Sequence, residues 1–244
     1  TRFSLNGGDI TLEAAGELEG ELLNQFSIDE YKEHFRFVLT DNRGEYSSNS
    51  LVILDGNLKK TGAISGIAED ERVYSVRFMG DTAYFVTFRQ VDPLFSVDVS
   101  DPTSPKIIGS LKIPGFSNYL FPFGKGMLFG MGQNADEKTG RSTGMKISMF
   151  DISDPSNVTE CAKTNISASY SEALYSHKAT LINSGKNIIG FSAYGWQNNI
   201  LYFIYAYENG ELVKKAEINL PHSNTGCRGL YSGDKFYVDR KSVV

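Results

Sequence analysis

The sequence predicts an all-β protein built from repeated four-stranded units, and three observations support this prediction. Thirteen Tyr and sixteen Phe among 244 residues favour strands over helices. A phrase also recurs in which a Gly-Asp or Gly-Lys turn separates two strand-like runs, with its glycines at Gly80, Gly124, Gly185 and Gly233. The intervals of 44 to 61 residues between these glycines accommodate four short strands and their loops, which need roughly 40–50 residues.

Each unit shows the same order of apolar runs and polar turns. The runs that predict the strands of four complete units are 25–39, 51–55 and 60–64; 73–88, 94–99 and 106–113; 119–131, 146–152 and 160–166; and 174–193, 200–208 and 212–218. Residues 1–5 and 9–18 precede these units, and residues 227–238 begin a fifth. We therefore expect a single β-propeller domain over residues 1–244, with about five four-stranded antiparallel blades. The N- and C-terminal strands are expected to share the last blade; in the alternative, further blades lie upstream in a longer protein.

Two of the units carry a Ser-Asp-Pro element after their third strand, at 95–102 and 149–155. Asp or Ser accepts hydrogen bonds from nearby backbone amides, and the following Pro sets φ for a type I turn. These elements are therefore expected to join the third strand to the fourth. A calcium loop is the alternative, but the EF-hand spacing and the Gly-rich Asp repeats are both absent.

Charge and composition exclude several classes of function. The net charge of -5, with Lys and Arg scattered singly, argues against a nucleic-acid or anionic-membrane partner. No apolar run reaches the roughly 18–20 residues of a membrane span. Cys161 and Cys227 can pair or remain free thiols. His34, His177 and His222 lack metal-ligand spacing, so neither a metal nor a cofactor is expected.

The polar connector Arg89, Gln90 and Asp92 interrupts a strand pattern that continues on both sides. On a propeller face, the planar guanidinium of Arg89 would meet an anionic or hydroxyl-rich ligand. The structural alternative, which we prefer, is an ion pair between Arg89 and Asp92 or between neighbouring units.

A second group of candidates is predicted to line the central channel. Arg77 occurs in the first strand of its unit, which is the strand that lines a propeller's channel, and Glu172, His177 and Arg228 occupy similar positions in later units. Convergent polar groups in a concavity form a default binding-site hypothesis. The alternative is a water-filled channel with mutually satisfied charges.

A dense aromatic segment surrounds the only tryptophan, Trp196. Exposed, it would offer a platform for stacking sugars or peptides. The alternation along residues 202–207 instead fits sheet packing between blades, in the core, which leaves Trp196 in its loop as the candidate for binding.

Several segments resemble the secreted β-propeller domain proteins of bacteria and archaea. They are Leu23-Asn-Gln-Phe-Ser-Ile-Asp-Glu-Tyr31, Tyr74-Ser-Val-Arg-Phe-Met-Gly-Asp81, Thr87-Phe-Arg-Gln-Val-Asp-Pro-Leu-Phe95 and Ser171-Glu-Ala-Leu-Tyr175. The resemblance covers nearly the whole chain. It implies a propeller fold and an extracellular or cell-surface location, without a known reaction.

These observations lead to two hypotheses of function. The first is a non-catalytic recognition or scaffold module that binds a protein or glycan through one face or the channel mouth. The alternative is a hydrolase or lyase that acts on polysaccharides at the channel mouth. A glycosidase needs two carboxylates a few ångströms apart, and Asp92 and Glu172 are the pair one would propose. The Gly-x-Ser-x-Gly elbow of serine hydrolases is absent.

Overall fold

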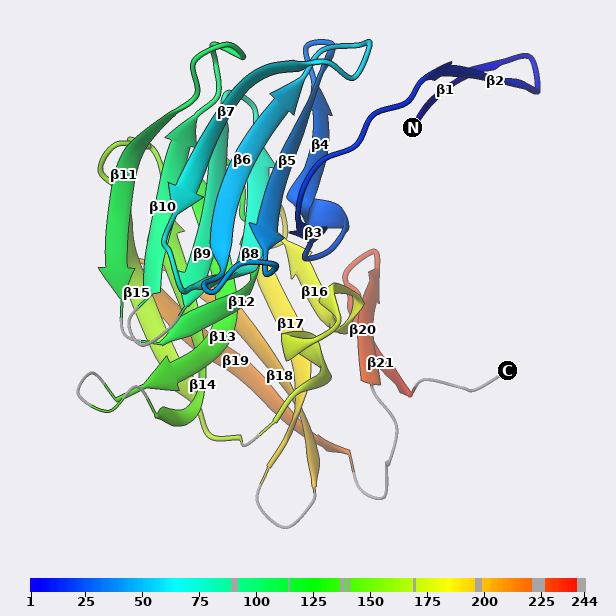
Figure 1. Ribbon diagram of the computed structural model, residues 1–244. Helices are drawn as coiled ribbons and strands as arrows, with labels where there is room; N and C mark the ends of the chain where they lie inside the picture. The colour runs from blue at the N-terminus through cyan, green and yellow to red at the C-terminus, as the bar shows by residue number, and fades with distance from the viewer. Residues whose placement is uncertain are drawn as a thin grey trace. The chain divides into compact units, whose positions relative to one another are not determined.

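A computed structural model describes residues 1–88, 92–113, 115–136, 139, 141–168, 170–195, 199–220 and 227–240, with the backbone alone at Asp92 and Arg240. The chain divides into two compact units, each described here by itself. Unit 1 contains residues 1–112 and 155–157, and unit 2 contains residues 113–154 and 158–244. In both, antiparallel strands lie side by side in sheets (Figure 1).

Unit 1 contains a hairpin and two full sheets. The hairpin pairs β1 (Arg2–Asn6) with β2 (Asp9–Ala14). The first full sheet contains β3 (Glu21–Leu22), the 3-10 turn η1 (Gln25–Ser27), β4 (Ile28–Tyr31), β5 (His34–Asp41), β6 (Ser48–Leu54) and β7 (Lys60–Ile67). The second contains β8 (Arg72–Met79), β9 (Thr82–Phe88), β10 (Asp92–Asp98) and β11 (Lys106–Ile113), paired in that order.

Unit 2 has two full sheets and a C-terminal hairpin. Its first sheet contains β12 (Phe116–Pro122), β13 (Met127–Ala135), β14 (Ser142–Asp151) and β15 (Thr159–Ile166). Its second contains β16 (Thr180–Asn183), β17 (Ile188–Tyr194), β18 (Ile200–Glu208) and β19 (Glu211–Leu220), preceded by η2 (Glu172–Leu174) and η3 (His177–Ala179). The hairpin pairs β20 (Cys227–Ser232) with β21 (Lys235–Arg240).

The predicted four-stranded antiparallel units are confirmed. Two predicted strands differ in detail. The run 25–39 divides into η1, β4 and β5, because Lys32 and Glu33 form a two-residue hairpin turn with positive φ of 50° and 63°. Such turns normally carry Asn or Gly, so the sequence gives no sign of this one. The run 174–193 begins with two 3-10 turns instead of a strand.

The described strand pairings do not contain the shared blade expected from the two chain ends. β1 and β2 form one two-stranded sheet, and β20 and β21 form another.

The core of each unit is built from the middle strands of its full sheets. In unit 1 Phe85 and Val97 are fully buried, and in unit 2 Phe129 and Phe191 are. Continuous apolar runs in these strands follow from burial on both faces.

The Ser-Asp-Pro elements are turns between the third and fourth strands, as predicted. Asp98 Oδ1 accepts a hydrogen bond from the Ser100 amide at 2.9 Å, and Asp151 Oδ1 accepts one from the Ser153 amide at 2.9 Å. Hydrogen bonding from the side chain of each serine, and then from its amide, holds the pKa of both carboxyls below the usual range. Within the described ranges, no group of three or more His, Cys, Asp and Glu is placed to hold a metal ion.

The second of these turns packs closely on a glycine in unit 1. A Cβ added to Gly109, on β11, would lie 2.6 Å from Ser96 Oγ, 3.0 Å from the Pro155 carbonyl oxygen and 3.1 Å from that of Ser156. The Ser96 hydroxyl donates a hydrogen bond to the Pro155 carbonyl at 2.5 Å. Gly109 is therefore needed for close approach of the backbone.

Among the described residues, no helix has the length and apolar character to cross a membrane.

Candidate functional site

The first candidate site lies in unit 2, where a buried serine fixes the backbone. The Ser171 side chain is fully buried; its hydroxyl donates to the Ser192 carbonyl at 2.5 Å and accepts from the Ala173 amide at 3.0 Å. The first bond ties the segment to β17, and the second caps η2. Because Glu172 follows this anchor directly, its position is set by the backbone.

Glu172 forms a two-point ion pair with Arg228 of β20. Arg228 Nη2 lies 2.6 Å from Glu172 Oε1, and Nη1 lies 3.0 Å from Oε2. Nη1 also donates to the Cys227 carbonyl. The hydrogen bond that Arg228 donates to the Glu172 carboxylate raises the pKa of Arg228. The two side chains remain 28% and 29% exposed, so solvent or a ligand can still reach the pair.

Three tyrosines surround this turn and form what we call the tyrosine surface: Tyr170, Tyr175 and Tyr194. The rings of Tyr170 and Tyr175 stack with centroids 5.7 Å apart and an angle of 24° between them. Tyr170 also contacts Tyr194, at 5.5 Å and 51°. Tyr175 is 62% exposed and Tyr170 is 44% exposed. Stacked aromatic rings that remain open to water are a feature of binding surfaces, because each ring offers an apolar face with a polar edge.

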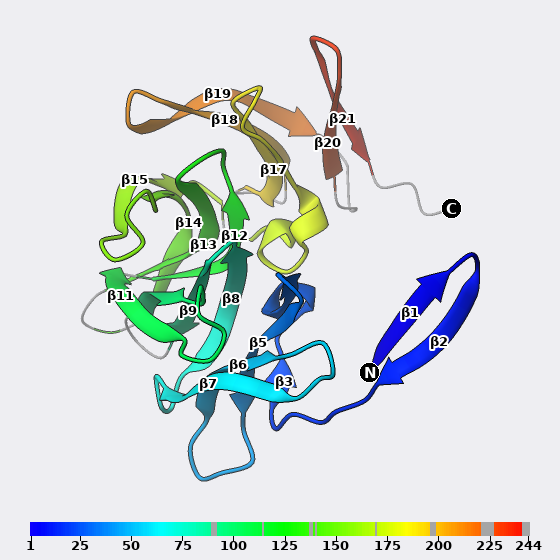
Figure 2. The same cartoon turned by 90° about the horizontal axis from the view of Figure 1, so that it is seen from above.

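The neighbouring strand β12 supports this surface. The Tyr119 hydroxyl donates a hydrogen bond to the Tyr175 carbonyl at 3.0 Å, and its ring lies 6.2 Å from that of His177. Burial raises the pKa of the Tyr119 hydroxyl. Figure 2 shows the 3-10 turns of unit 2 between the strands labelled β12 and β17. Residues 170–179 therefore place Tyr170, Tyr175 and the Glu172 carboxylate together, and Arg228 of β20 adds its guanidinium.

The structure brings together part of the group predicted to line the channel. Glu172 and Arg228 meet, and His177 lies beside Tyr119 in the same unit. Arg77 belongs to β8 of unit 1, where its guanidinium lies 3.8 Å from the centroid of the Phe26 ring. Burial lowers the pKa of Arg77 to about 10. It therefore stays charged at neutral pH.

The remaining predictions fall on other parts of the chain. Arg89, Gln90, Trp196 and His222 lie outside the described residues, as does the side chain of Asp92. Cys161 is exposed and Cys227 is buried, and no disulfide joins them in the described structure. Tyr202, Phe203 and Tyr205 are buried, as expected for core residues in the segment 202–207. Sequence reasoning missed Tyr170 and Tyr175, because their spacing of five residues matches neither a strand face nor a helix face.

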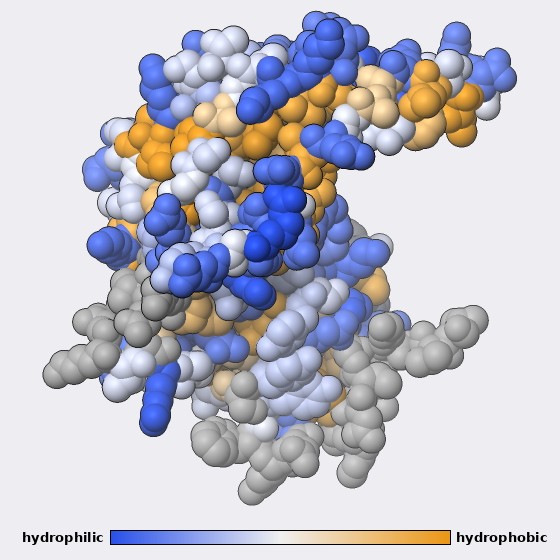
Figure 3. Space-filling model, in the orientation of Figure 1, coloured by the Kyte–Doolittle hydropathy of each residue, from blue (hydrophilic) through white to orange (hydrophobic). Residues whose placement is uncertain are grey.

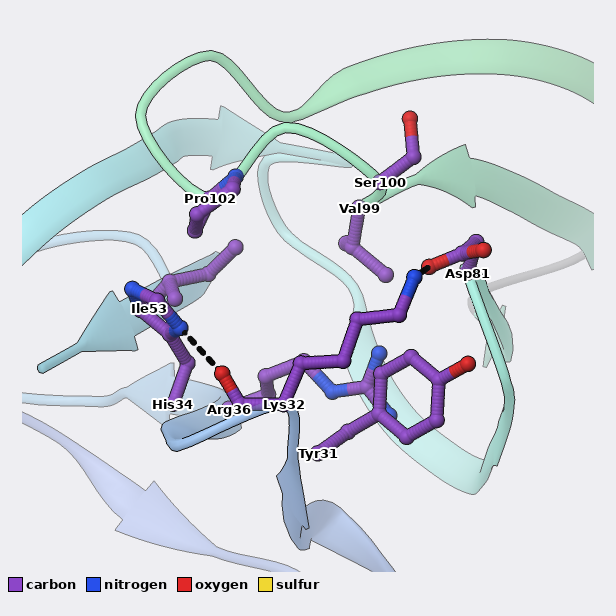
Figure 4. A pocket seen from close by; sticks show the side chains of 9 residues that line it. All are labelled: Tyr31, Lys32, His34, Arg36, Ile53, Asp81, Val99, Ser100 and Pro102. Atoms are coloured by element: carbon purple, nitrogen blue, oxygen red, sulfur yellow. Dashed lines mark hydrogen bonds and ion pairs between the residues drawn. The ribbon is translucent and has the colours of Figure 1, made fainter. Parts of the chain in front are cut away.

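Unit 1 contains a second candidate, a cavity of about 200 Å³ at the turns between strands (Figure 4). Lys32, His34, Arg36 and Asp81 line it together with the apolar side chains of Ile53, Val99 and Pro102. The Lys32 Nζ lies 2.9 Å from Asp81 Oδ1, and the hydrogen bond raises the pKa of Lys32.

The floor of this cavity is a buried arginine. The Arg36 Nε and Nη2 donate to Asp29, and Nη1 donates to the Gly80 carbonyl. Its guanidinium lies 4.7 Å from the Tyr31 ring centroid and 4.9 Å from that of Phe78. The ring of Tyr31, which also lines the cavity, is approached by both Lys32 and Arg36. An aromatic face is therefore less available to a ligand here than on the tyrosine surface, where Tyr170 and Tyr175 are exposed.

Comparisons with known proteins agree with this architecture. The model of the family described as "Beta propeller domain" matches residues 1–244. An uncharacterised protein of Archaeoglobus fulgidus is 38% identical over 238 residues, which cover 97% of this chain and 35% of that protein. The uncharacterised protein MJ1554 of Methanocaldococcus jannaschii is 35% identical, with 92% of this chain and 34% of that protein covered. The chain thus spans about a third of these relatives.

A similar fold occurs in the solved structure of Pyrococcus horikoshii acylaminoacyl peptidase. The TM-score is 0.50 at 15% identity, over 82% of this chain and 32% of the peptidase chain. Similarity at this level of identity concerns the fold alone.

Proposed function

Since this chain belongs to the Beta propeller domain family, we propose that it is a non-catalytic recognition module that binds a glycan or protein through the tyrosine surface of unit 2. The observation that carries the proposal is the stacked, exposed pair Tyr170 and Tyr175 beside the accessible ion pair of Glu172 and Arg228. We further propose an extracellular or cell-surface setting.

The chemistry of this surface suits a glycan better than a peptide. The apolar face of a sugar ring packs on an aromatic face, and the sugar hydroxyls need donors and acceptors at its edge. Arg228 supplies donors in a planar fork, while Glu172 supplies acceptors. These groups already hold one another in position, so little side-chain freedom is lost when a ligand binds.

The observed engagement of Glu172 does not suit glycoside hydrolysis. That reaction uses two carboxyl groups on either side of the scissile bond. Glu172 is instead engaged by Arg228 at two points, so both of its carboxylate oxygens already accept hydrogen bonds. The observed arrangement therefore supports a recognition role better than a catalytic one.

Binding to arrays of immobilised oligosaccharides and peptides tests the proposal, with titration calorimetry on the hits. Tyr175→Ala should weaken glycan binding about tenfold or more, because a stacking face is lost. Tyr46→Ala is the matched control, since Tyr46 in unit 1 is 60% exposed, and it should bind as the unchanged protein does. Equal binding by both variants, or release of cleaved sugar, would contradict the proposal.

A further inference from the structure

Arg228 uses only part of its guanidinium in the ion pair with Glu172. Its Nη1 and Nη2 donate to the two Glu172 oxygens, and Nη1 also donates to the Cys227 carbonyl. A guanidinium carries five N–H groups in a fixed plane. Among the residues that the structure describes, Nε–H and the second N–H of Nη2 have no hydrogen-bond partner. These two groups lie side by side and form what we call the free edge of Arg228.

The free edge can be reached from solvent. The Arg228 side chain is 28% exposed, while the Glu172 carboxylate occupies the neighbouring edge of the guanidinium. Within the described part of the chain, no nitrogen of Arg228 is both buried and without a hydrogen-bond partner. Because Glu172 holds the plane of the guanidinium, the free edge keeps one direction and loses little freedom when a ligand binds.

Two parallel N–H groups select a ligand with two acceptor oxygens next to each other. A carboxylate and a sulfate have this arrangement, and both pair with arginine through two hydrogen bonds. Two hydroxyl groups on neighbouring carbons of a sugar ring have it as well, since each hydroxyl oxygen accepts hydrogen bonds. The free edge by itself therefore fits both an acidic sugar and a neutral one.

The charges around Arg228 favour the neutral sugar. Glu172 already matches the positive charge of the guanidinium. Strand pairing also places Asp239 of β21 directly opposite Arg228, which puts the two side chains on one face of the hairpin with Cβ atoms roughly 5 Å apart. Asp239 is exposed. Two carboxylates thus lie around one guanidinium, and they repel a ligand that carries a carboxylate or a sulfate.

The exposed rings beside the pair also suit a hydroxyl-rich ligand. Unit 1 gathers exposed apolar side chains on its β1–β2 hairpin (Figure 3), where Phe3 and Leu5 have no polar group to offer. The exposed rings of the tyrosine surface, Tyr170 and Tyr175, each carry a hydroxyl. A ligand of this surface gains most when it combines an apolar face with several hydroxyls, as a sugar ring does.

We propose that the ligand of the tyrosine surface is a neutral glycan, and that the free edge of Arg228 binds two hydroxyl groups on neighbouring carbons of one sugar. This inference rests on the recognition role proposed above. Stacking on Tyr175 contributes affinity for sugar rings in general. Arg228 determines which sugars bind, and Glu172 positions its guanidinium.

An oligosaccharide array with three matched sets of probes tests the class of ligand. The sets are neutral hexose oligomers, the corresponding uronic-acid oligomers, and deoxy analogues that lack one of the two neighbouring hydroxyls. Neutral oligomers should bind about tenfold tighter than the deoxy analogues, because one hydrogen bond is lost. They should bind about fivefold tighter than the uronic-acid oligomers at low salt, with a smaller difference at high salt, where repulsion is screened.

The outcomes separate this inference from the recognition role on which it rests. Equal or tighter binding of the uronic-acid oligomers, or of the deoxy analogues, would overturn the inference and leave glycan recognition standing. Binding to none of the glycans would overturn both.

Arg228→Lys separates the contact with hydroxyls from stacking. Lysine keeps the positive charge but has no parallel pair of N–H groups, so the variant should bind neutral oligomers about tenfold more weakly and lose the preference over deoxy analogues. Arg43→Lys is the matched control, because Arg43 of unit 1 is 63% exposed and pairs with Asp41, and it should bind as the unchanged protein does. Melting temperatures from circular dichroism check that both variants remain folded. A retained preference in Arg228→Lys would overturn the assignment.

Asp239→Asn tests the role of charge without touching the hydrogen bonds of Arg228. The change removes one carboxylate from the face of the hairpin that carries Arg228. Binding of the uronic-acid oligomers should approach that of the neutral oligomers, whose own affinity should not change. Unaltered discrimination against the uronic-acid oligomers would show that charge does not select the ligand, and the proposal of a neutral glycan would fail.

Discussion

Each unit contains an ion pair between an arginine and a carboxylate, and the two pairs differ in how deeply the arginine is buried. In unit 1 the side chain of Arg36 is 3% exposed and that of Asp29 is 32% exposed. Two aromatic rings and the Gly80 carbonyl complete the surroundings of the guanidinium. In unit 2 the side chains of Arg228 and Glu172 are 28% and 29% exposed and lie beside exposed tyrosines, so the two pairs differ in the exposure of the arginine.

This difference separates a structural ion pair from a pair available for binding. A buried charge whose donors are used within the fold costs free energy if one partner is lost, and it offers little to a ligand. An exposed pair contributes at most about 1 kcal/mol to stability. Its groups remain within reach of a ligand. Mutations that affect folding in unit 1 and recognition in unit 2 would sharpen the contrast.

The largest effect is expected for Asp29→Ala. This change leaves the Arg36 charge buried without its carboxylate, and breaking such a pair costs about 3 kcal/mol of the free energy of unfolding. Urea denaturation followed by circular dichroism measures the loss. Asp81→Ala is the control, because its partner Lys32 is exposed, and it should cost less than about 1 kcal/mol. Equal losses for both variants would remove the distinction between buried and exposed pairs.

A smaller loss of stability is expected where the turn at residues 155–156 packs against Gly109 in unit 1. Gly109→Ala places a methyl group against Ser96 Oγ and the carbonyl oxygens of residues 155 and 156, and overpacking of this kind costs about 2 kcal/mol. The corresponding position in unit 2 is Ala162, on β15, which also lies four residues before a strand-ending Ile.

The matched change in unit 2 is Ala162→Gly. It should cost only about 0.5–1 kcal/mol, through the greater freedom of glycine in the unfolded chain. Urea denaturation of both variants tests the comparison. Close packing at Gly109 would not be a constraint if its variant were as stable as the unchanged protein.

The strands and turns of both units could be predicted because their signals are local. Apolar runs and Gly-Asp, Gly-Lys and Ser-Asp-Pro turns act through neighbouring residues. The two-residue turn at Lys32 and Glu33 was missed because neither residue is one that such turns prefer.

The candidate sites could be predicted only in part. Glu172 and Arg228 were placed in one group because both occur at the start of a unit, and they do form an ion pair. The stacking of Tyr170 on Tyr175 depends on how residues 171–174 turn. That turn rests on the burial of the Ser171 hydroxyl against β17, a contact between segments that periodicity along the chain does not report.

The smallest effect on stability, and the most direct test of recognition, is expected for Glu172→Gln. Glutamine retains an acceptor for Arg228 but removes the charge, so the free energy of unfolding should fall by less than about 1 kcal/mol. Under the proposed function, affinity for a glycan should fall while the melting temperature is retained. Glu217→Gln removes the partner of Lys214 in another exposed pair of unit 2, and it should change neither property. A loss of stability at Glu172 as large as that at Asp29 would assign both ion pairs to the fold, and the contrast between the units would disappear.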